Sequence, residues 1–271
     1  MQDSPGIRLY LGQMTVILQD ILPEAHYGAP GLPGIAPCQP DDWLRVDEAY
    51  AAQMAYRRAL IAERPADVLW HDPQAQAAEV EVLRAALKLL PGLGFEVADE
   101  SVVCPDGQVV KLDFTCPLKT LGQLVQEDIC ILQRQENEHV LTAAVVCFPA
   151  NWRLAEKAGR PLVGIHDTVA EYDADVARRV QRLFDGVRVG RPLWRFNRLS
   201  YAEADLHQPW RHNTTAPPRF ERSERQCILR LPQSDAVVFT IHTWVVAQLS
   251  PAAARTLMRG SVGRITPACP E

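Results

Sequence analysis

Apolar positions predict two helices in the first third of the chain, and in the second of them these positions are spaced three or four apart. The first covers residues 41–63, begins at the capping pair Asp41 and Asp42, and ends at Pro65. The second begins at Asp72 and ends at a Pro-Gly pair at positions 91–92. The apolar positions are Leu44, Tyr50, Met54 and Ile61 in the first helix, and Val80, Leu83, Leu87 and Leu90 in the second. We expect these helices to pack against each other as a hairpin.

After the second helix, short runs of β-branched and apolar residues predict an antiparallel sheet. The runs cover residues 109–114, 129–132, 141–148, 193–199, 227–231 and 236–246, with a turn at 135–137. A third helix follows the capping residue Asp173, and a short last helix opens at Ser250 and Pro251. In the third helix, Val176, Val180, Leu183 and Val187 form the apolar stripe, and Arg178, Arg179 and Arg182 face solvent. The predicted fold class is therefore α+β.

The first 40 residues differ from the rest because glycine and proline recur in them. These residues cannot sustain a helix or a central strand. They are Gly28, Pro30, Gly31, Pro33, Gly34, Pro37 and Pro40. We therefore expect an extended arm over residues 1–40, followed by a single domain over residues 41–271.

Composition narrows the class of partner. The chain has 271 residues, of which 47% are hydrophobic and 23% charged, so it is long enough and apolar enough to bury a sizeable core. Its net charge of −5 provides no basic field that would bind nucleic acid. We expect small molecules or other proteins as partners instead.

Location and redox state follow from what the sequence lacks. It contains no run of the roughly 18 apolar residues that a membrane-spanning helix needs, and no signal peptide. The seven cysteines form no C-x-x-C pair, which argues against zinc, iron–sulfur and c-type haem motifs. We expect a cytoplasmic protein without membrane contact, in which the thiols are reduced and buried. Nucleotide-binding G-x-G-x-x-G and P-loop motifs are also missing, as are the G-x-S-x-G and H-E-x-x-H motifs of common hydrolases.

Two histidines lie in apolar segments where an imidazole could ligate a metal. His166 ends the run Pro161 to His166, which reads as a buried strand, and His242 lies within the run from Val237 to Trp244. The alternative for both is a core histidine whose ring nitrogens are satisfied by backbone carbonyls.

Two predicted strands carry polar residues on one face. Alternation places Arg195 and Asn197 together, opposite Trp194 and Phe196, and it places Glu224, Gln226 and Arg230 together on the next strand. In a closed pocket Arg195 would need an anionic partner, and Glu224 could pair with Arg195 or Arg230 or hold a cationic amine. The alternatives are an exposed strand face and an ordinary surface ion pair.

Several segments together resemble the haem-dependent oxidative N-demethylase family. They are residues 126–132 (QEDICIL), 147–149 (CFP) with Trp152, 156–159 (EKAG), 165–166 (IH), Arg195 with Asn197, 224–226 (ERQ) and 230–232 (RLP). The resemblance runs in order from about Asp42 to Leu249. It implies a PAS-like antiparallel sheet with flanking helices and an N-terminal helical segment. It also implies a b-type haem and the oxygen-dependent removal of a methyl group, as formaldehyde, from a small secondary amine such as dimethylamine.

The resemblance also implies roles for individual residues. His166 would be the proximal ligand of the haem iron, and Glu224 and Arg195 would be catalytic residues on the distal side, where amine and oxygen meet. Asn197, Arg225 and Arg230 would belong to the cofactor pocket. Electrons could come from a flavin or iron–sulfur reductase on a separate chain, and the protein could form a homo-oligomer.

The sequence departs from the family pattern at two places. Residues 167–170 (DTVA) stand where the family usually has a Pro-Val-Pro turn, and Arg198 stands where it tends to have tryptophan. Two other functions therefore stay open. One is a PAS-like sensor or carrier that binds haem or another small ligand without turnover, and the other is a structural subunit that has lost the cofactor.

Overall fold

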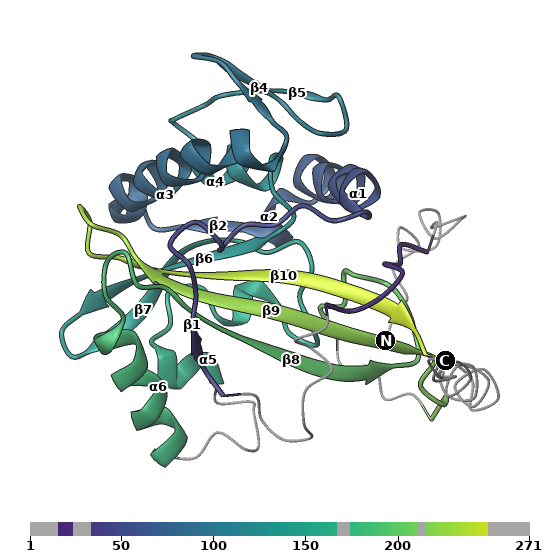
Figure 1. Cartoon of the computed structure of the whole chain (residues 1–271). Coiled ribbons are helices and arrows are strands. Elements are labelled where there is room, and N and C mark those ends of the chain that lie inside the picture. Colours follow the sequence, from purple (N-terminus) through teal and green to yellow (C-terminus); the bar gives the residue numbers. More distant parts are fainter. Residues whose placement is uncertain (1–15, 24–33, 167–173, 211–214, 249–271) are drawn as a thin grey trace, which may run out of the picture.

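The protein is built around one large antiparallel sheet. The computed structural model describes residues 16–23, 34–166, 174–210 and 215–248, and in them seven strands pair in the order β1-β8-β9-β10-β6-β7-β2 (Figure 1). The strands are β1 (Ala36–Pro37), β2 (Leu69–His71), β6 (Asp128–Gln135), β7 (Glu138–Val145), β8 (Leu193–Tyr201), β9 (Phe220–Arg230) and β10 (Val237–Ala247). All of the pairings are antiparallel, which confirms an α+β fold with an antiparallel sheet.

Helices cover both faces of this sheet, as the view in Figure 1 shows. The face called here the upper face carries α1 (Tyr50–Glu63), α3 (Gln76–Leu89) and the short α4 (Pro117–Gly122). The lower face carries α5 (Leu162–His166) and α6 (Ala174–Gly186). Each side buries its own apolar cluster, with Ile129, Ile131 and Val238 in the upper cluster and Leu132, Phe184 and Ile228 in the lower one. The sheet therefore separates two distinct interiors.

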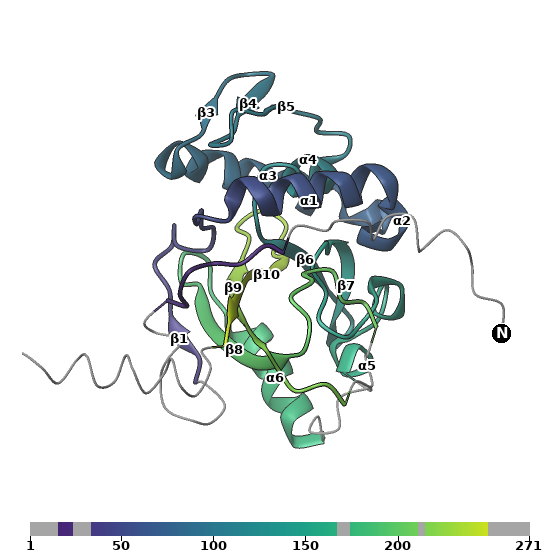
Figure 2. The ribbon, with the colours of Figure 1, turned by 90° about the vertical axis from the view of Figure 1, so that its right-hand side faces the viewer.

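Smaller elements connect and cover this framework. They are α2 (Pro65–Val68), the 3-10 turns Pro73–Ala75, Leu90–Leu93 and Leu154–Glu156, and a three-stranded sheet of β3 (Glu96–Val97), β4 (Ser101–Val103) and β5 (Val109–Lys111). Figure 2 shows the small sheet outside α3, away from the large sheet. Part of the predicted arm touches the large sheet, because β1 pairs with β8 and the backbone N–H of Gln19 donates to the Val245 carbonyl at 2.9 Å.

Several predicted elements were correct in kind. The five strands predicted between residues 129 and 246 all form as β6 to β10, and so does helix α6, whereas β1 and β2 were not predicted. The predicted turn at 135–137 joins β6 to β7, with Glu136 at φ 53°. Arg178, Arg179 and Arg182 are exposed, as expected. Asp173 and the segment at Ser250 and Pro251 lie outside the described residues. Within the described residues, no helix is long and apolar enough to span a membrane.

Other predictions were wrong. Helix α1 begins at Tyr50 instead of residue 41, because Asp42 pairs with Arg45 and Arg225 and does not cap a helix. The helices α1 and α3 form no direct hairpin, since the chain between them enters the sheet as β2. Residues 109–111 belong to the small sheet. The run from Pro161 to His166 forms the helix α5 instead of a strand.

The described cysteines form no disulfide with one another. Cys104, Cys130, Cys147 and Cys227 are buried, as predicted. Cys116 is exposed, and Cys38 is only partly buried, so the expectation of burial was wrong for Cys116 and only partly met for Cys38.

Candidate active site

Pairing of β8 with β9 gathers five polar side chains on the lower face. Arg195 is opposite Gln226, and Asn197 is opposite Glu224. Directly paired residues of antiparallel strands share a face, and so do residues two apart along one strand. Arg195 and Asn197 of β8 therefore lie on the same face as Arg222, Glu224 and Gln226 of β9. The predicted grouping of Arg195, Asn197, Glu224 and Gln226 is confirmed.

Glu224 is the centre of this polar cluster, and its side chain is only 8% exposed. The Asn197 amide donates to Glu224 Oε2 at 2.8 Å, and the Glu224 backbone N–H donates back to Asn197 Oδ1 at 3.0 Å. Arg222 Nε donates to Glu224 Oε1 at 3.1 Å, and Gln226 Nε2 donates to Oε2 at 3.3 Å. These donors fix the orientation of the carboxylate.

Arg222 ties this carboxylate to two loops. Its side chain is 1% exposed, and beyond Glu224 it donates to the carbonyls of Leu206, at 2.9 Å, and of Phe148. Every nitrogen of the guanidinium therefore has an acceptor. The prediction that Glu224 pairs with Arg195 or Arg230 missed this partner, because Arg222 lies in a segment whose polar composition does not read as a strand.

Arg195, unlike Arg222, has a guanidinium nitrogen without a hydrogen-bond acceptor among the described residues. Burial lowers the pKa of its guanidinium, and the nearby Glu224 carboxylate offsets only part of that effect. Its Nε is buried and has no hydrogen-bond partner among the described residues. A buried cationic donor without an acceptor is costly, and it matches an anionic group that enters from outside the described chain.

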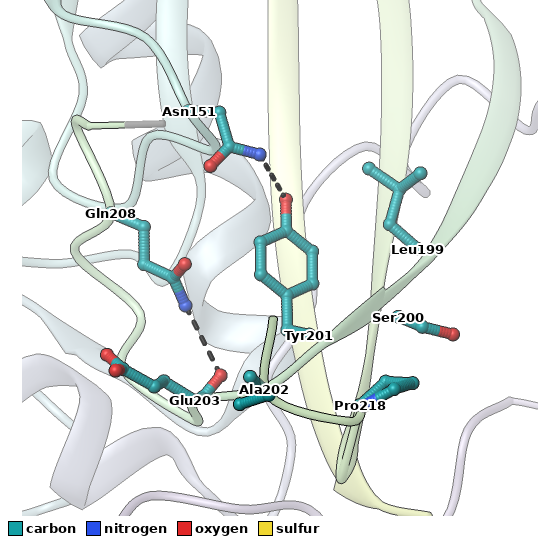
Figure 3. A pocket seen from close by; sticks show the side chains of 9 residues that line it. Asn151, Leu199, Ser200, Tyr201, Ala202, Glu203, Gln208 and Pro218 are labelled. Atoms are coloured by element: carbon teal, nitrogen blue, oxygen red, sulfur yellow. Dashed lines mark hydrogen bonds between the residues drawn. The ribbon is translucent and has the colours of Figure 1, made fainter. Parts of the chain in front are cut away.

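A pocket of about 350 Å³ opens at the C-terminal end of β8. It is lined by Asn151, Leu199, Ser200, Tyr201, Ala202, Glu203, Gln208, Ala216 and Pro218 (Figure 3). The Asn151 amide donates to the Tyr201 hydroxyl at 3.1 Å, and burial raises the pKa of Tyr201. Glu224 also raises that pKa, whereas Arg222 lowers it, so the pocket lies within electrostatic reach of the polar cluster. Its residues come from three separate segments, and no sequence pattern signalled it.

A comparison with known protein families identifies the family of this chain. The family model for haem-dependent oxidative N-demethylase, alpha subunit-like, matches residues 34–256. The chain belongs to the haem-dependent oxidative N-demethylase alpha subunit-like family. Membership confirms the resemblance found in the sequence. Haem is therefore the cofactor that the residues of the site would have to accommodate.

The described residues fit a haem in two respects. A haem needs apolar walls and cationic partners for its propionates. On the lower face the large side chains of Trp152, Leu193 and Phe239 pack against the apolar cluster while staying only partly buried. Arg195 supplies a cation whose Nε still lacks an acceptor among the described residues. The described residues hold no group of three or more His, Cys, Asp or Glu for a bare metal ion, but a haem iron needs only axial ligation.

His166 ends α5, which lies below the sheet on the same side as the polar cluster (Figure 1). Its side chain lies outside the described part of the structure, so its role as iron ligand stays a prediction.

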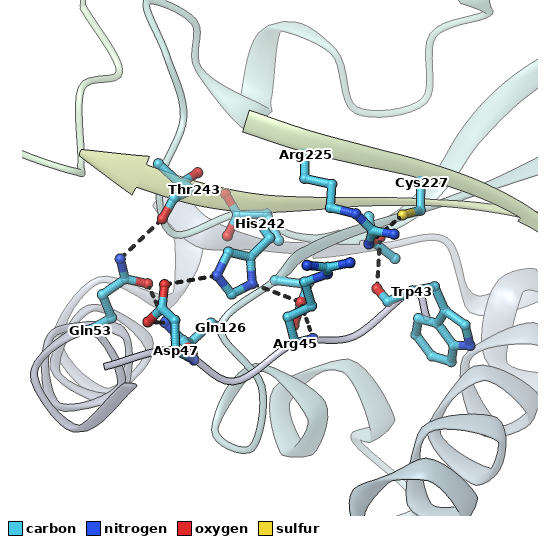
Figure 4. A network of polar contacts seen from close by, with 12 residues as sticks. Trp43, Arg45, Asp47, Gln53, Gln126, Arg225, Cys227, His242 and Thr243 are labelled. Carbon is cyan, nitrogen blue, oxygen red and sulfur yellow. Dashed lines mark hydrogen bonds and ion pairs between the residues drawn. The ribbon is translucent and has the colours of Figure 1, made fainter. Parts of the chain in front are cut away.

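His242, the other histidine that the sequence offers as a ligand, is excluded by its contacts. His242 is on the upper face, where Nδ1 is 2.9 Å from Glu127 Oε1 and Nε2 is 3.2 Å from Asp47 Oδ2 (Figure 4). Burial lowers its pKa, but the two carboxylates outweigh burial and raise the value to about 9, so both ring nitrogens carry protons.

Two further predicted cofactor residues lie away from the cluster. Arg225 is on the upper face, where it contacts Asp42 Oδ2 at 2.9 Å. Arg230 is six residues beyond Glu224, about 20 Å along an extended strand. It donates to the carbonyls of Phe184 and Val187 at the end of α6, at 2.7 and 2.8 Å, and pairs with Asp235. The structure thus brings Arg195, Asn197 and Glu224 together, and it leaves Arg225 and Arg230 apart from them.

Sequence reasoning also missed His207. Its Nδ1 is 2.7 Å from the Cys147 carbonyl, and its Nε2 is buried without a partner among the described residues. Burial lowers its pKa, so the ring is neutral at pH 7. A neutral imidazole whose Nδ1–H is fixed by a carbonyl has the form that ligates metals through Nε2. The local sequence gives no sign of this contact, which joins residues far apart in the chain.

Proposed function

We propose that this chain binds a b-type haem in a PAS-like fold, against the lower face of the large sheet, and removes a methyl group oxidatively from a small secondary amine. The observation that carries the proposal is the pair formed by a fixed, nearly buried Glu224 and a neighbouring Arg195 with an unpartnered Nε. Family membership supplies the cofactor. The bound haem would supply oxygen activation.

The residues of the chain have separate tasks in this proposal. His166 would hold the iron from the end of α5. Glu224 would bind the alkylammonium ion of a dimethylamine-like substrate, because its carboxylate is held in one orientation by Asn197, Arg222 and Gln226. The same carboxylate can take up the proton that the amine loses. Arg195 would stabilise negative charge through its Nε, either on oxygen or on a haem propionate.

The methyl carbon would leave as formaldehyde, and the amine would be one carbon shorter. Electrons for the reduction of oxygen would come from a flavin or iron–sulfur reductase on a separate chain. The family description names an alpha subunit, which supports an assembly with other subunits. The pocket at Tyr201 would be the route by which a small amine reaches Glu224.

The first test is haem binding. Purified protein reconstituted with haemin is expected to show a Soret band that shifts on reduction with dithionite. His166→Ala should lose this spectrum, whereas His71→Ala, which removes an exposed histidine on β2, should keep it. No Soret band in the unmutated protein would overturn the whole proposal, and an unchanged spectrum in His166→Ala would overturn the ligand.

The second test is amine turnover. Haem-loaded protein is reduced with a stoichiometric amount of dithionite and mixed with dimethylamine and oxygen, and formaldehyde is measured after a single turnover. Glu224→Gln should keep the Soret band, and its rate of formaldehyde formation should fall at least about 100-fold. This is the size of the rate loss expected when a positioned acid or base is removed. Glu63→Gln, an exposed change on α1, serves as the control. A Soret band without formaldehyde in the unmutated protein would instead indicate a haem-binding sensor or carrier.

A further inference from the structure

The pocket at the C-terminal end of β8 is much larger than a small amine. Its volume is about 350 Å³. Dimethylamine has three non-hydrogen atoms, and if each takes the roughly 30 Å³ of a water molecule in the liquid, the amine fills about 90 Å³. By the same measure the pocket has room for about ten such atoms. It can therefore hold a considerable part of a longer ligand.

Strand β8 connects this pocket to the polar cluster around Glu224. Asn197, Leu199 and Tyr201 are two residues apart along β8, so their side chains share the lower face. Asn197 contacts Glu224, and Tyr201 lines the pocket. Leu199, which lies between them, is 48% exposed, so the face beside β8 is open to a ligand at this point.

The separation of the two ends sets the length of a ligand that reaches both. Asn197 and Tyr201 are four residues apart, which is about 13 Å along an extended strand. A chain molecule of about ten non-hydrogen atoms, with about 1.5 Å per bond, has a similar length. One molecule of this size can therefore contact Glu224 at one end and the pocket at the other.

The polar side chains of the pocket are held so that oxygen atoms remain available to a ligand. The Asn151 amide nitrogen donates to the Tyr201 hydroxyl at 3.1 Å. The Gln208 amide nitrogen donates to the carbonyls of Asp205, at 2.6 Å, and Glu203, at 3.4 Å. Figure 3 shows these two amides on the loops that face Tyr201. Because each amide uses its nitrogen in these contacts, its oxygen is left to accept from another group.

The charge of the lining favours a cation. Glu203 is the only charged residue among the described residues that line the pocket, and it is exposed at the rim. Its carboxylate and the amide oxygens of Asn151 and Gln208 are acceptors, whereas a primary ammonium group has three donors and no acceptor. The lining therefore matches an ammonium group better than an anion or an apolar tail.

We propose that the pocket binds a second ammonium group of the substrate, and that the substrate is a long N-methylated diamine. This inference rests on the proposed function, because it requires the methylated nitrogen at Glu224. From there the carbon chain would pass Leu199. The distal ammonium would contact the carboxylate of Glu203 and the amide oxygens of Asn151 and Gln208.

Two amines of equal length test the inference. N-Methyl-1,6-diaminohexane and N-methylheptylamine have the same number of non-hydrogen atoms and differ only in whether the chain ends in an ammonium or a methyl group. Isothermal titration calorimetry measures their binding to the full-length chain, with and without added haemin. We expect the diamine to bind at least about tenfold more tightly, which is the effect of a hydrogen bond to a charged group. Equal affinities, or tighter binding of N-methylheptylamine, would overturn the inference.

Variants locate the preference in the pocket. Glu203→Gln removes an exposed charge, so it should not affect folding, and it should lower the preference for the diamine about threefold, as expected for a partly exposed ion pair. Tyr201→Phe removes the acceptor that holds the Asn151 amide and should also lower the preference. Glu63→Gln is the control and should leave it unchanged. An unchanged preference in Glu203→Gln and in Tyr201→Phe would overturn the assignment to this pocket.

Formaldehyde measurements separate this inference from the proposed function. Preferential binding of the diamine without formaldehyde from any amine would support the ammonium site and overturn the proposed oxidation. Formaldehyde from dimethylamine, together with equal binding of the two long amines, would overturn only the inference about the diamine.

Discussion

Three buried or partly buried arginines differ in how well their guanidinium groups are hydrogen-bonded. Arg57 is fully buried and donates to Asp128 Oδ1 at 2.6 Å and to the Glu127 carbonyl at 2.8 Å. Arg222 is equally buried and equally satisfied. Arg195, in contrast, has a buried Nε without a partner among the described residues. Unsatisfied buried groups concentrate where function requires them, because they cost stability.

This contrast predicts that replacing Arg195 and replacing Arg222 change the free energy of unfolding by very different amounts. Arg195→Met should change the free energy of unfolding of the haem-free protein by less than about 1 kcal/mol, because it removes a poorly satisfied charge. Arg222→Met should lower that free energy by about 3–5 kcal/mol, because it leaves the Glu224 carboxylate buried without its cation. Urea unfolding followed by circular dichroism measures both. An equal loss in the two variants would show that Arg195 is a structural residue.

Residue patterns anticipated part of the site. Alternation along β8 correctly placed Arg195 and Asn197 on one face, because strand geometry alone determines it. The partners of Glu224 could not be derived in the same way. They depend on register, which pairs Asn197 with Glu224, and on loops that bring the Leu206 and Phe148 carbonyls to Arg222.

At the scale of elements, the errors follow from polar residues that are buried. Strand β9 begins at Phe220, seven residues before the predicted start at 227, because residues 221–226 (ERSERQ) have the composition of a surface loop. Arg222, Ser223, Glu224 and Arg225 are nevertheless buried in the strand, where specific partners compensate their charge and polarity. Composition reflects the average burial of each residue type. It therefore does not predict a buried strand whose polar side chains all have partners.

Helix α6 depends on one arginine of β9. Arg230 donates to the Phe184 and Val187 carbonyls at the C-terminal end of this helix, where carbonyls lack partners within the helix. Arg230→Ala should therefore destabilise α6 by about 1–3 kcal/mol. Hydrogen exchange measured by mass spectrometry should speed up over residues 174–187 and stay unchanged in β6 and β7.

The matched control for this change is Arg182→Ala, an exposed arginine on the same helix. It should alter exchange in α6 very little, since surface substitutions usually act within about 0.5 kcal/mol. Equal acceleration in both variants would mean that Arg230 does not fasten the end of the helix.

At the scale of the whole molecule, the upper face is held together by a buried charged network around His242. Asp47 accepts from Gln126 at 2.7 Å and from Gln19 at 2.8 Å, and Glu127 accepts the Arg45 backbone N–H at 2.8 Å. Gln19 and Gln53 also donate to the Thr243 carbonyl. The network around His242 thus joins five segments: the described part of the arm, the chain before α1, α1 itself, the residues just before β6, and β10.

This network makes stability depend on pH in a definite direction. The pKa of His242 is raised from 6.5 to about 9, mainly by Glu127 and Asp47 acting against burial. A group whose pKa is raised on folding stabilises the protein fully below its unfolded pKa, and that contribution disappears as the pH rises through the folded value. The stabilisation by His242 should therefore be complete below pH 6.5 and lost near pH 9. Its size is about 3 kcal/mol for a shift of this extent.

The measurement is the difference in unfolding free energy between the unmutated protein and His242→Gln, taken by urea unfolding from pH 6 to 9.5. The difference isolates His242, because Cys38, whose lowered pKa acts with the opposite sign in the same range, is present in both proteins. We expect the difference to fall by about 3 kcal/mol between pH 6.5 and 9. A difference that stays constant over this range would mean that His242 is not charged in the folded protein. The two carboxylates that flank it would then have to be satisfied mainly by the glutamines and the backbone.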